Sequence, residues 1–91
     1  MKYTVIWKPS AKQHLADIWL SAEDRAAIAS AADRIDRLLA SDPLDVGESR
    51  SGNDRILIDV PLAVVFEVSE LDRRVDVLTI RHVPRAPRDS G

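Results

Sequence analysis

The sequence predicts an α+β domain in which a helical hairpin packs on one face of an antiparallel sheet. Three runs rich in valine and isoleucine are typical of strands, because branched side chains suit a pleated backbone. The breaks between these runs are short enough for the tight connections of a C-terminal three-strand meander. Two earlier segments place apolar residues at helical spacing. The strand runs cover residues 55–60, 62–68 and 74–82, and the helical segments cover 11–19 and 25–39.

The composition is that of one small domain without metal or disulfide staples. We expect residues 1–83 to form a single core and 84–91 to form an extended or mobile tail. Cysteine is absent, which excludes disulfides and thiolate zinc sites. Thirteen basic and fifteen acidic side chains leave a formal charge of -2, which argues against a surface built wholly for nucleic acid. With no cationic leader and no apolar run near ~20 residues, we expect a cytoplasmic protein that does not enter membranes.

The chain begins with a strand and an amphipathic helix. Residues 2–7 alternate, with Tyr3, Val5 and Trp7 on one side of the predicted strand. Ser10 is placed as the N-cap of the helix that follows. The apolar residues of this helix include Trp19, and its periodicity predicts that both tryptophans belong to the core between helices and sheet.

A second, longer helix follows a serine and a carboxylate spaced as a capping box, Ser21 and Asp24. Residues 41–43, Ser-Asp-Pro, end it. Residues 44–53 are polar and irregular, and we expect 48–50 to form a brief edge strand before the meander. The apolar stripe of the second helix is predicted to comprise Ile28, Ala31 or Ala32, Ile35, Leu38 and Leu39.

Three segments in this order resemble the RelE/ParE superfamily, the bacterial toxins of type II toxin–antitoxin modules, including those of plasmid-stabilisation systems. Residues 7–11, Trp-Lys-Pro-Ser-Ala, lead into the first helix as in that family. Residues 64–68, Val-Val-Phe-Glu-Val, resemble its valine-tyrosine-x-valine strand. Residues 77–82, Val-Leu-Thr-Ile-Arg-His, followed by Arg85, resemble its closing strand.

The resemblance implies a growth-inhibiting toxin that a cognate antitoxin silences by wrapping a helix and an extended segment over it. Two mechanisms share the fold. RelE-like members cut mRNA in the ribosomal A site with a basic surface on the sheet, whereas ParE-like members poison DNA gyrase by contact. The resemblance also implies higher-order toxin–antitoxin complexes.

The sequence departs from the cationic set that the resemblance assigns to RelE-like nucleases. Arg55 matches the first of two lysines on one strand, but the second position is Leu57. The arginine that opens the next strand is replaced by Ala63, and Arg85 matches the late basic residue. The tyrosine that follows it has no counterpart in residues 86–91.

A nuclease built from the remaining residues would need a base, an acid and cations that stabilise the phosphorane. Arg55, Arg81 and Arg85 are candidates for charge stabilisation, His82 for proton transfer and Glu67 for the base. Each also has a structural interpretation. A lone histidine at a strand end, such as His82, is more often a structural hydrogen-bonding residue, and Glu67 is first of all an outward residue on a half-buried strand. Arg81 is equally an ion-pair partner of Asp59 or Asp76 across neighbouring strands. Arg55 is also a solvated strand arginine, and Arg85 a tail residue that serves solubility.

The incomplete cationic set favours a ParE-like, non-enzymatic toxin over a RelE-like mRNA endonuclease, because a ribosome-bound nuclease must collect phosphate contacts. A third hypothesis is a degenerate toxin that survives as a protein-binding module. No cofactor is expected. A metal site is not expected either, since His14 has no second histidine one turn along its helix.

Overall fold

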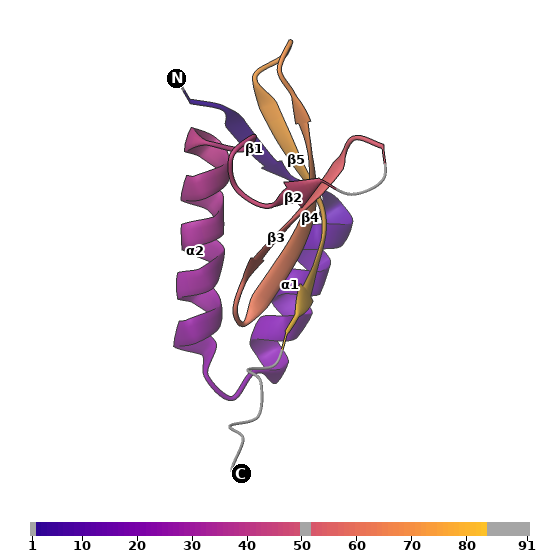
Figure 1. The fold of residues 1–91 in the computed structure, drawn as a ribbon. Helices are drawn as coiled ribbons and strands as arrows, with labels where there is room; N and C mark the ends of the chain where they lie inside the picture. The colour runs from indigo at the N-terminus through magenta and orange to yellow at the C-terminus, as the bar shows by residue number, and fades with distance from the viewer. Residues whose placement is uncertain (1, 50–51, 84–91) are drawn as a thin grey trace.

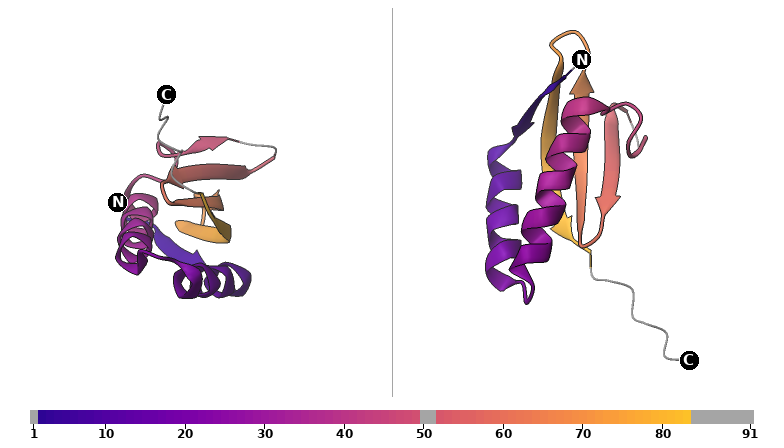
Figure 2. Two further views of the ribbon diagram at one scale, coloured as in Figure 1. Left: turned by 90° about the horizontal axis from the view of Figure 1, so that it is seen from below. Right: turned by 90° about the vertical axis from the view of Figure 1, so that its left-hand side faces the viewer.

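The computed structural model describes residues 2–49 and 52–83, which form two helices and a five-stranded sheet. In chain order the elements are β1 (Thr4–Trp7), α1 (Pro9–Ser21), α2 (Arg25–Ser41), β2 (Glu48–Ser49), β3 (Asp54–Asp59), β4 (Leu62–Ser69) and β5 (Arg74–His82), as labelled in Figure 1. Both helices lie on one face of the sheet (Figure 2). The predicted fold class is confirmed.

The sheet has the strand order β1-β5-β4-β3-β2. Strands β3, β4 and β5 form the predicted antiparallel meander, and β2 is the predicted edge strand. Strand β1 is the exception, because it pairs with β5 in parallel, from Thr4 beside Arg74 to Trp7 beside Val77. The start of the chain therefore lies against its last strand, and this pairing places α1 over β5.

The core lies between the sheet and α2. Four residues of α2 are buried at helical spacing, namely Ile28, Ala31, Ile35 and Leu39. They pack with Ala11 of α1 and with Leu62, Val64, Phe66, Val75, Val77 and Ile80 of β4 and β5. Leu38 was expected in the stripe, but it is 39% exposed because it lies one residue, about 100° of rotation, from Leu39.

Both helices begin differently from the prediction. Lys8 is the N-cap of α1 and Pro9 occupies its first turn, where the fixed φ of proline suits a helix start. Ser10 is inside the helix, and its hydroxyl donates to the carbonyl of Leu78 at 3.2 Å. Asp24 alone caps α2, since its Oδ1 accepts from the amide of Ala27 at 3.0 Å. Ser21 does not cap α2: it is the last residue of α1, and three residues separate it from the start of α2.

The strand register defines two faces of the sheet. Residues paired across antiparallel strands point to the same side, and successive residues alternate. Arg55 pairs with buried Phe66, and Leu57 with buried Val64, so Arg55, Leu57 and Asp59 lie on the face covered by helices, here called the helix face. The opposite side is called the open face, and it carries Asp54, Ile56, Ile58, Ala63, Val65 and Glu67.

Strand β5 contains a register shift that keeps its own core residues inward. Val65 pairs with Thr79 and Phe66 with Val77, which leaves Leu78 as an extra residue. Val77 and Ile80 consequently both face the helices, and both are buried. In the described part of the chain, no helix is long and apolar enough to cross a membrane.

The cap of α2 can be tested by Asp24→Ala, with Ser21→Ala as the matched control. We expect Asp24→Ala to lower the free energy of unfolding by about 1 kcal/mol, because one helix amide loses its acceptor. Ser21→Ala should cost less than about 0.5 kcal/mol, since its hydroxyl only donates to a carbonyl within α1. Urea unfolding measures both. Equal losses would mean that Ser21 contributes to the cap after all.

Candidate functional site

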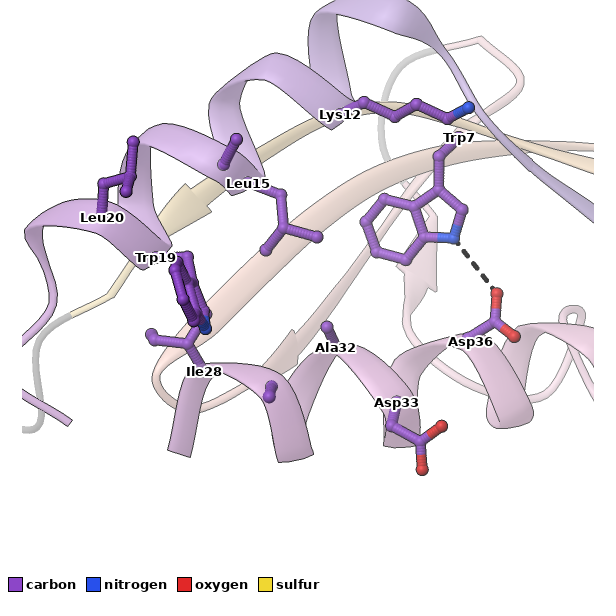
Figure 3. A pocket seen from close by; sticks show the side chains of 11 residues that line it. Trp7, Lys12, Leu15, Trp19, Leu20, Ile28, Ala32, Asp33 and Asp36 are labelled. Carbon is purple, nitrogen blue, oxygen red and sulfur yellow. Dashed lines mark hydrogen bonds between the residues drawn. The ribbon is translucent and has the colours of Figure 1, made fainter. Parts of the chain in front are cut away.

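An apolar groove of about 660 Å³ runs between α1 and α2, on the outer side of the helical hairpin (Figure 3). Two exposed apolar side chains line it, Trp19 (41% exposed) and Leu20 (62% exposed). The prediction that Trp19 is a core residue is wrong. Ala29 and Ala32 of α2 line the same groove with short side chains. Trp7 is half-buried and packs against the core as predicted.

Arg25 borders the Trp19 end of the groove. Its guanidinium carbon lies 4.7 Å from the centroid of the Trp19 ring, a cation–π distance. Its Nε donates to the carbonyl of Trp19 at 3.0 Å, and its Nη2 donates to the carbonyl of Leu20 at 3.0 Å. One side chain at the start of α2 thus stacks on the indole and satisfies two carbonyls at the end of α1.

The opposite end of the groove is more polar. The Trp7 indole Nε1 donates to Asp36 Oδ1 at 3.1 Å, as Figure 3 shows. Lys12 of α1 and Asp33 of α2 also line this end. A ligand along the groove therefore meets apolar surface at Trp19 and charged rims of both signs near Trp7.

Arg55 lies on the helix face, where it holds the loop that follows α2. Its Nη1 donates to Ser49 Oγ at 3.1 Å, and its Nη2 donates to the carbonyls of Leu44 at 3.0 Å and Gly47 at 3.5 Å. Its buried Nε has no hydrogen-bond partner within the described residues. The guanidinium is engaged by the protein itself, and a phosphate would have to displace these acceptors.

Gly47 explains how closely this loop approaches β3. Its φ is +76°, and a Cβ at this position would clash with the carbonyl oxygen of Ile56. Only glycine combines that backbone conformation with that contact. The loop is therefore held against the sheet in two ways. The backbone of Gly47 lies close to β3, and the side chain of Arg55 donates hydrogen bonds to the loop carbonyls.

Glu67 is on the open face, between two other carboxylates. It pairs across the strands with Asp54 on β3 and with Asp76 on β5. Asp76 is 8% exposed, and its Oδ1 lies 3.2 Å from Nε of Arg74 in an ion pair that lacks hydrogen-bond geometry. Like charges opposite one another repel, so this acidic row disfavours a phosphate backbone at this end of the open face.

Arg81 is also on the open face, opposite Ala63, and it is exposed. Neither predicted ion pair forms. Asp59 lies on the helix face, so the sheet separates it from Arg81, and Asp76 lies on β5 itself, five residues before Arg81. Asp59 accepts two hydrogen bonds from Arg34, at 2.9 and 3.0 Å, and this contact raises the pKa of Arg34 above its ordinary value. Asp76 faces Arg74. Within residues 2–49 and 52–83, Arg81 makes no ion pair.

His82 pairs with Leu62 and lies on the helix side of β5, where it lines a second cleft of about 700 Å³ beside the connection between α1 and α2. Val60 and Pro61 line the same cleft, together with acidic side chains of the connection. Glu67 and His82 are on opposite sides of the sheet, and six residues of β5, roughly 20 Å, separate His82 from the partner of Glu67.

The five predicted site residues are therefore not brought together. Arg55 and His82 lie on the helix side, Glu67 and Arg81 lie on the open face, and Arg85 lies outside the described residues. In the described ranges no group of three or more histidine, aspartate or glutamate side chains is arranged to hold a metal ion. The groove was missed at the sequence level, although alanines at 16, 29 and 32 were its signal.

No protein-family model and no curated protein matches the chain. Solved structures do match. A chain of the RelBE2 toxin–antitoxin complex from Mycobacterium tuberculosis is 19% identical, with a TM-score of 0.74 over 90% of this chain and 92% of that one. A chain of a chromosomal ParDE system from P. aeruginosa is 17% identical, with a TM-score of 0.67 over 91% and 98%. The isolated E. coli RelE toxin is 12% identical, with a TM-score of 0.63 over 93% and 88%.

These likenesses define the class of fold first: a small α+β toxin fold with a helical hairpin on one face of a mostly antiparallel sheet. More narrowly, it is the fold of the RelE/ParE superfamily, as the sequence resemblance implied. RelE and ParE structures match the chain at similarly low identity.

The structural role of Arg55 can be separated from a catalytic role by comparing Arg55→Gln with Arg81→Gln. We expect Arg55→Gln to lower the free energy of unfolding by about 1 to 2 kcal/mol, since charge-assisted hydrogen bonds to the loop are lost. Arg81→Gln on the exposed open face should change it by less than about 0.5 kcal/mol. Thermal and urea unfolding measure the difference. An Arg55→Gln protein as stable as the parent would leave Arg55 without the structural role described here.

Proposed function

We propose that this protein is the toxin of a type II toxin–antitoxin module, acts in the cytoplasm, and is silenced by an antitoxin helix that occupies the groove between α1 and α2. The open apolar groove carries this proposal, because it lies on a fold shared with proteins solved as toxin–antitoxin complexes. The antitoxin is a separate protein of the same module.

The groove has the size and lining that a helix requires. Helix α1 has 13 residues, roughly 20 Å of wall, which matches about three turns of a partner helix. Ala16, Ala29 and Ala32 allow a second backbone to approach closely, while larger apolar side chains stand at the rim. Amphipathic helices bind such grooves by placing their apolar face inward. The exposed tryptophan and leucine would thereby leave water.

For the toxic action, we propose ParE-like inhibition of DNA gyrase by contact, without RNA cleavage. The open-face positions of β3 are Asp54, Ile56 and Ile58, none of which is basic. Arg55 is engaged by the loop, and Glu67 stands between two other acids. An mRNA nuclease must hold phosphates with cations and stabilise the transition-state charge. These side chains of the open face supply neither phosphate-binding cations nor stabilisation of the transition-state charge.

RelE-like mRNA cleavage is the second candidate, because Arg81 is exposed on the open face without an ion pair in the described part of the chain. The chain also has structural neighbours of the RelE type. A nuclease of this kind would combine Arg81 with residues beyond those described, such as Arg85. A protein-binding module without toxicity is the third candidate.

The mechanism is tested by inducing the protein alone in bacterial cells. We expect growth to stop, gyrase-linked DNA breaks to accumulate, and the 5′ ends of ribosome-associated mRNA to stay unchanged, because the open face lacks a phosphate-binding set. Arg81→Ala and His82→Ala should still arrest growth. Codon-positioned mRNA cuts that either variant abolishes would reverse the preference in favour of the nuclease. Normal growth of cells with the parent protein would leave only the binding module.

The antitoxin site is tested with Ala29→Arg, and Ser30→Arg is the matched control. Both residues are exposed on α2, but only Ala29 lines the groove. We expect Ala29→Arg to weaken binding of the antitoxin encoded in the adjacent reading frame at least tenfold, since a charge would be buried against apolar surface. Ser30→Arg should change the affinity less than twofold. Isothermal titration calorimetry measures both, and equal affinities would place the antitoxin elsewhere on the toxin.

A further inference from the structure

The exposed apolar surface of the helical hairpin is concentrated at the end of the groove where Trp19 lies. Trp19 and Leu20 are adjacent residues in the last turns of α1, and Ile28 of α2 lines the groove at the same end in Figure 3. Tryptophan is the side chain that most often dominates binding at an interface, because it removes a large apolar area from water and loses few rotamers. A half-exposed indole with no core function is therefore a candidate anchor.

Arg25 fixes the position of this indole before any partner binds. The guanidinium makes three contacts within the hairpin: it stacks on the ring at 4.7 Å and donates to the carbonyls of Trp19 and Leu20. The planar fork of arginine allows stacking and hydrogen bonding together, which lysine cannot reproduce. An indole held in its bound position costs less conformational entropy on association.

Arg25 also leaves one hydrogen-bonding direction available to a partner. Its Nε and Nη2 are engaged, and within the described residues its Nη1 donates no hydrogen bond. No carboxylate forms an ion pair with it among those residues. A carboxylate of a bound helix would therefore find a positioned cation beside the apolar anchor site, and this pair would be partly desolvated once the groove is filled.

We infer that Trp19 is the side chain on which an antitoxin helix anchors and that Arg25 is the residue that positions the Trp19 indole. Together they select an antitoxin helix that carries both a large apolar side chain and a carboxylate. This inference rests on the proposed toxin–antitoxin function. The helix places a large aliphatic or aromatic side chain against Trp19, Leu20 and Ile28. An acidic residue three or four positions away from that side chain, on the same helix face, pairs with Arg25. The occupant is thus an amphipathic helix of the antitoxin that carries a carboxylate beside its apolar anchor side chain.

The anchor is tested by titrating purified toxin variants with the antitoxin encoded in the adjacent reading frame. We expect Trp19→Ala to weaken binding at least 100-fold and Leu20→Ala at least fivefold. Leu71→Ala is the control, because Leu71 is 96% exposed at the β4–β5 turn, at the opposite end of the molecule from the α1–α2 connection (Figure 1). It should bind within twofold of the parent. Trp19→Ala binding as tightly as Leu71→Ala would overturn the inference.

The positioning role needs a readout that a merely structural residue would not change. Arg25→Gln should weaken antitoxin binding at least tenfold and flatten the salt dependence of the affinity, whereas Arg25→Lys should keep the salt dependence and recover only part of the affinity. In the free protein, Arg25→Gln should shift the indole N–H resonance of Trp19 and leave that of Trp7 in place. An unchanged salt dependence in Arg25→Gln, or an unmoved Trp19 resonance, would overturn the role given to Arg25.

Failure of this inference is distinguishable from failure of the proposed function. If the parent protein arrests growth and its antitoxin binds the Trp19→Ala variant normally, the function stands and the anchor is wrong. If the parent protein never arrests growth, the toxin proposal fails whatever the binding data show. Sedimentation of the toxin alone tests whether a second copy of this chain occupies the groove instead. A dimer that Trp19→Ala converts to a monomer would show that it does, and would overturn the inference.

Discussion

Burial of one side of α2 against the meander is the constraint on which the rest of the structure depends. Ile28, Ile35 and Leu39 are almost completely buried, and each contributes roughly 1.5 to 3 kcal/mol through the apolar area it removes from water. Their partners are on the two central strands, with Phe66 as the largest. Ala29 and Ala32 lie beside this stripe and form one wall of the groove, and the half-buried Ala32 also packs against the core.

Helix α1 is held much less deeply, and this difference creates the groove. Ala11 is its only fully buried residue among those described, while Leu15 and Ile18 are half-buried. Its larger apolar side chains, Trp19 and Leu20, are left exposed at the rim of the groove. The contacts of Arg25 with Trp19 and Leu20 then fix the far end of the hairpin. The fold thus buries one side of α2 in the core and leaves much of the apolar surface of α1 exposed.

The sequence predicted the elements well, and the α2 stripe and the meander were confirmed because each repeats its pattern over several turns or strands. It could not predict which side of β3 faces the helices. Ile56 and Ile58 alternate with Arg55, Leu57 and Asp59, and hydrophobicity alone favours the isoleucines as the buried set. The observed register places Arg55 and Asp59 on the helix face, where the loop carbonyls and Arg34 are their partners. A polar side chain with specific tertiary partners can outweigh the alternation, and those partners are far away in the sequence.

Trp19 shows the same limit, since periodicity gives the direction of a side chain but not whether the neighbouring helix fills the space in front of it.

The near balance of charge in the composition conceals where the cations are engaged. In the described part of the chain, most arginines have internal partners: Arg34 with Asp59, Arg37 with Asp33, Arg74 with Asp76, Arg55 with loop carbonyls and Arg73 with the ring of Tyr3. A guanidinium already satisfied by a carboxylate gains little from a phosphate, because the new contact replaces an existing one of similar strength. Nucleic-acid affinity scales with the number of cations that can release counterions from phosphates, and internal pairing removes them from that number. For this reason the location of each arginine, rather than the total charge, supports the proposal that this protein recognises another protein instead of holding RNA.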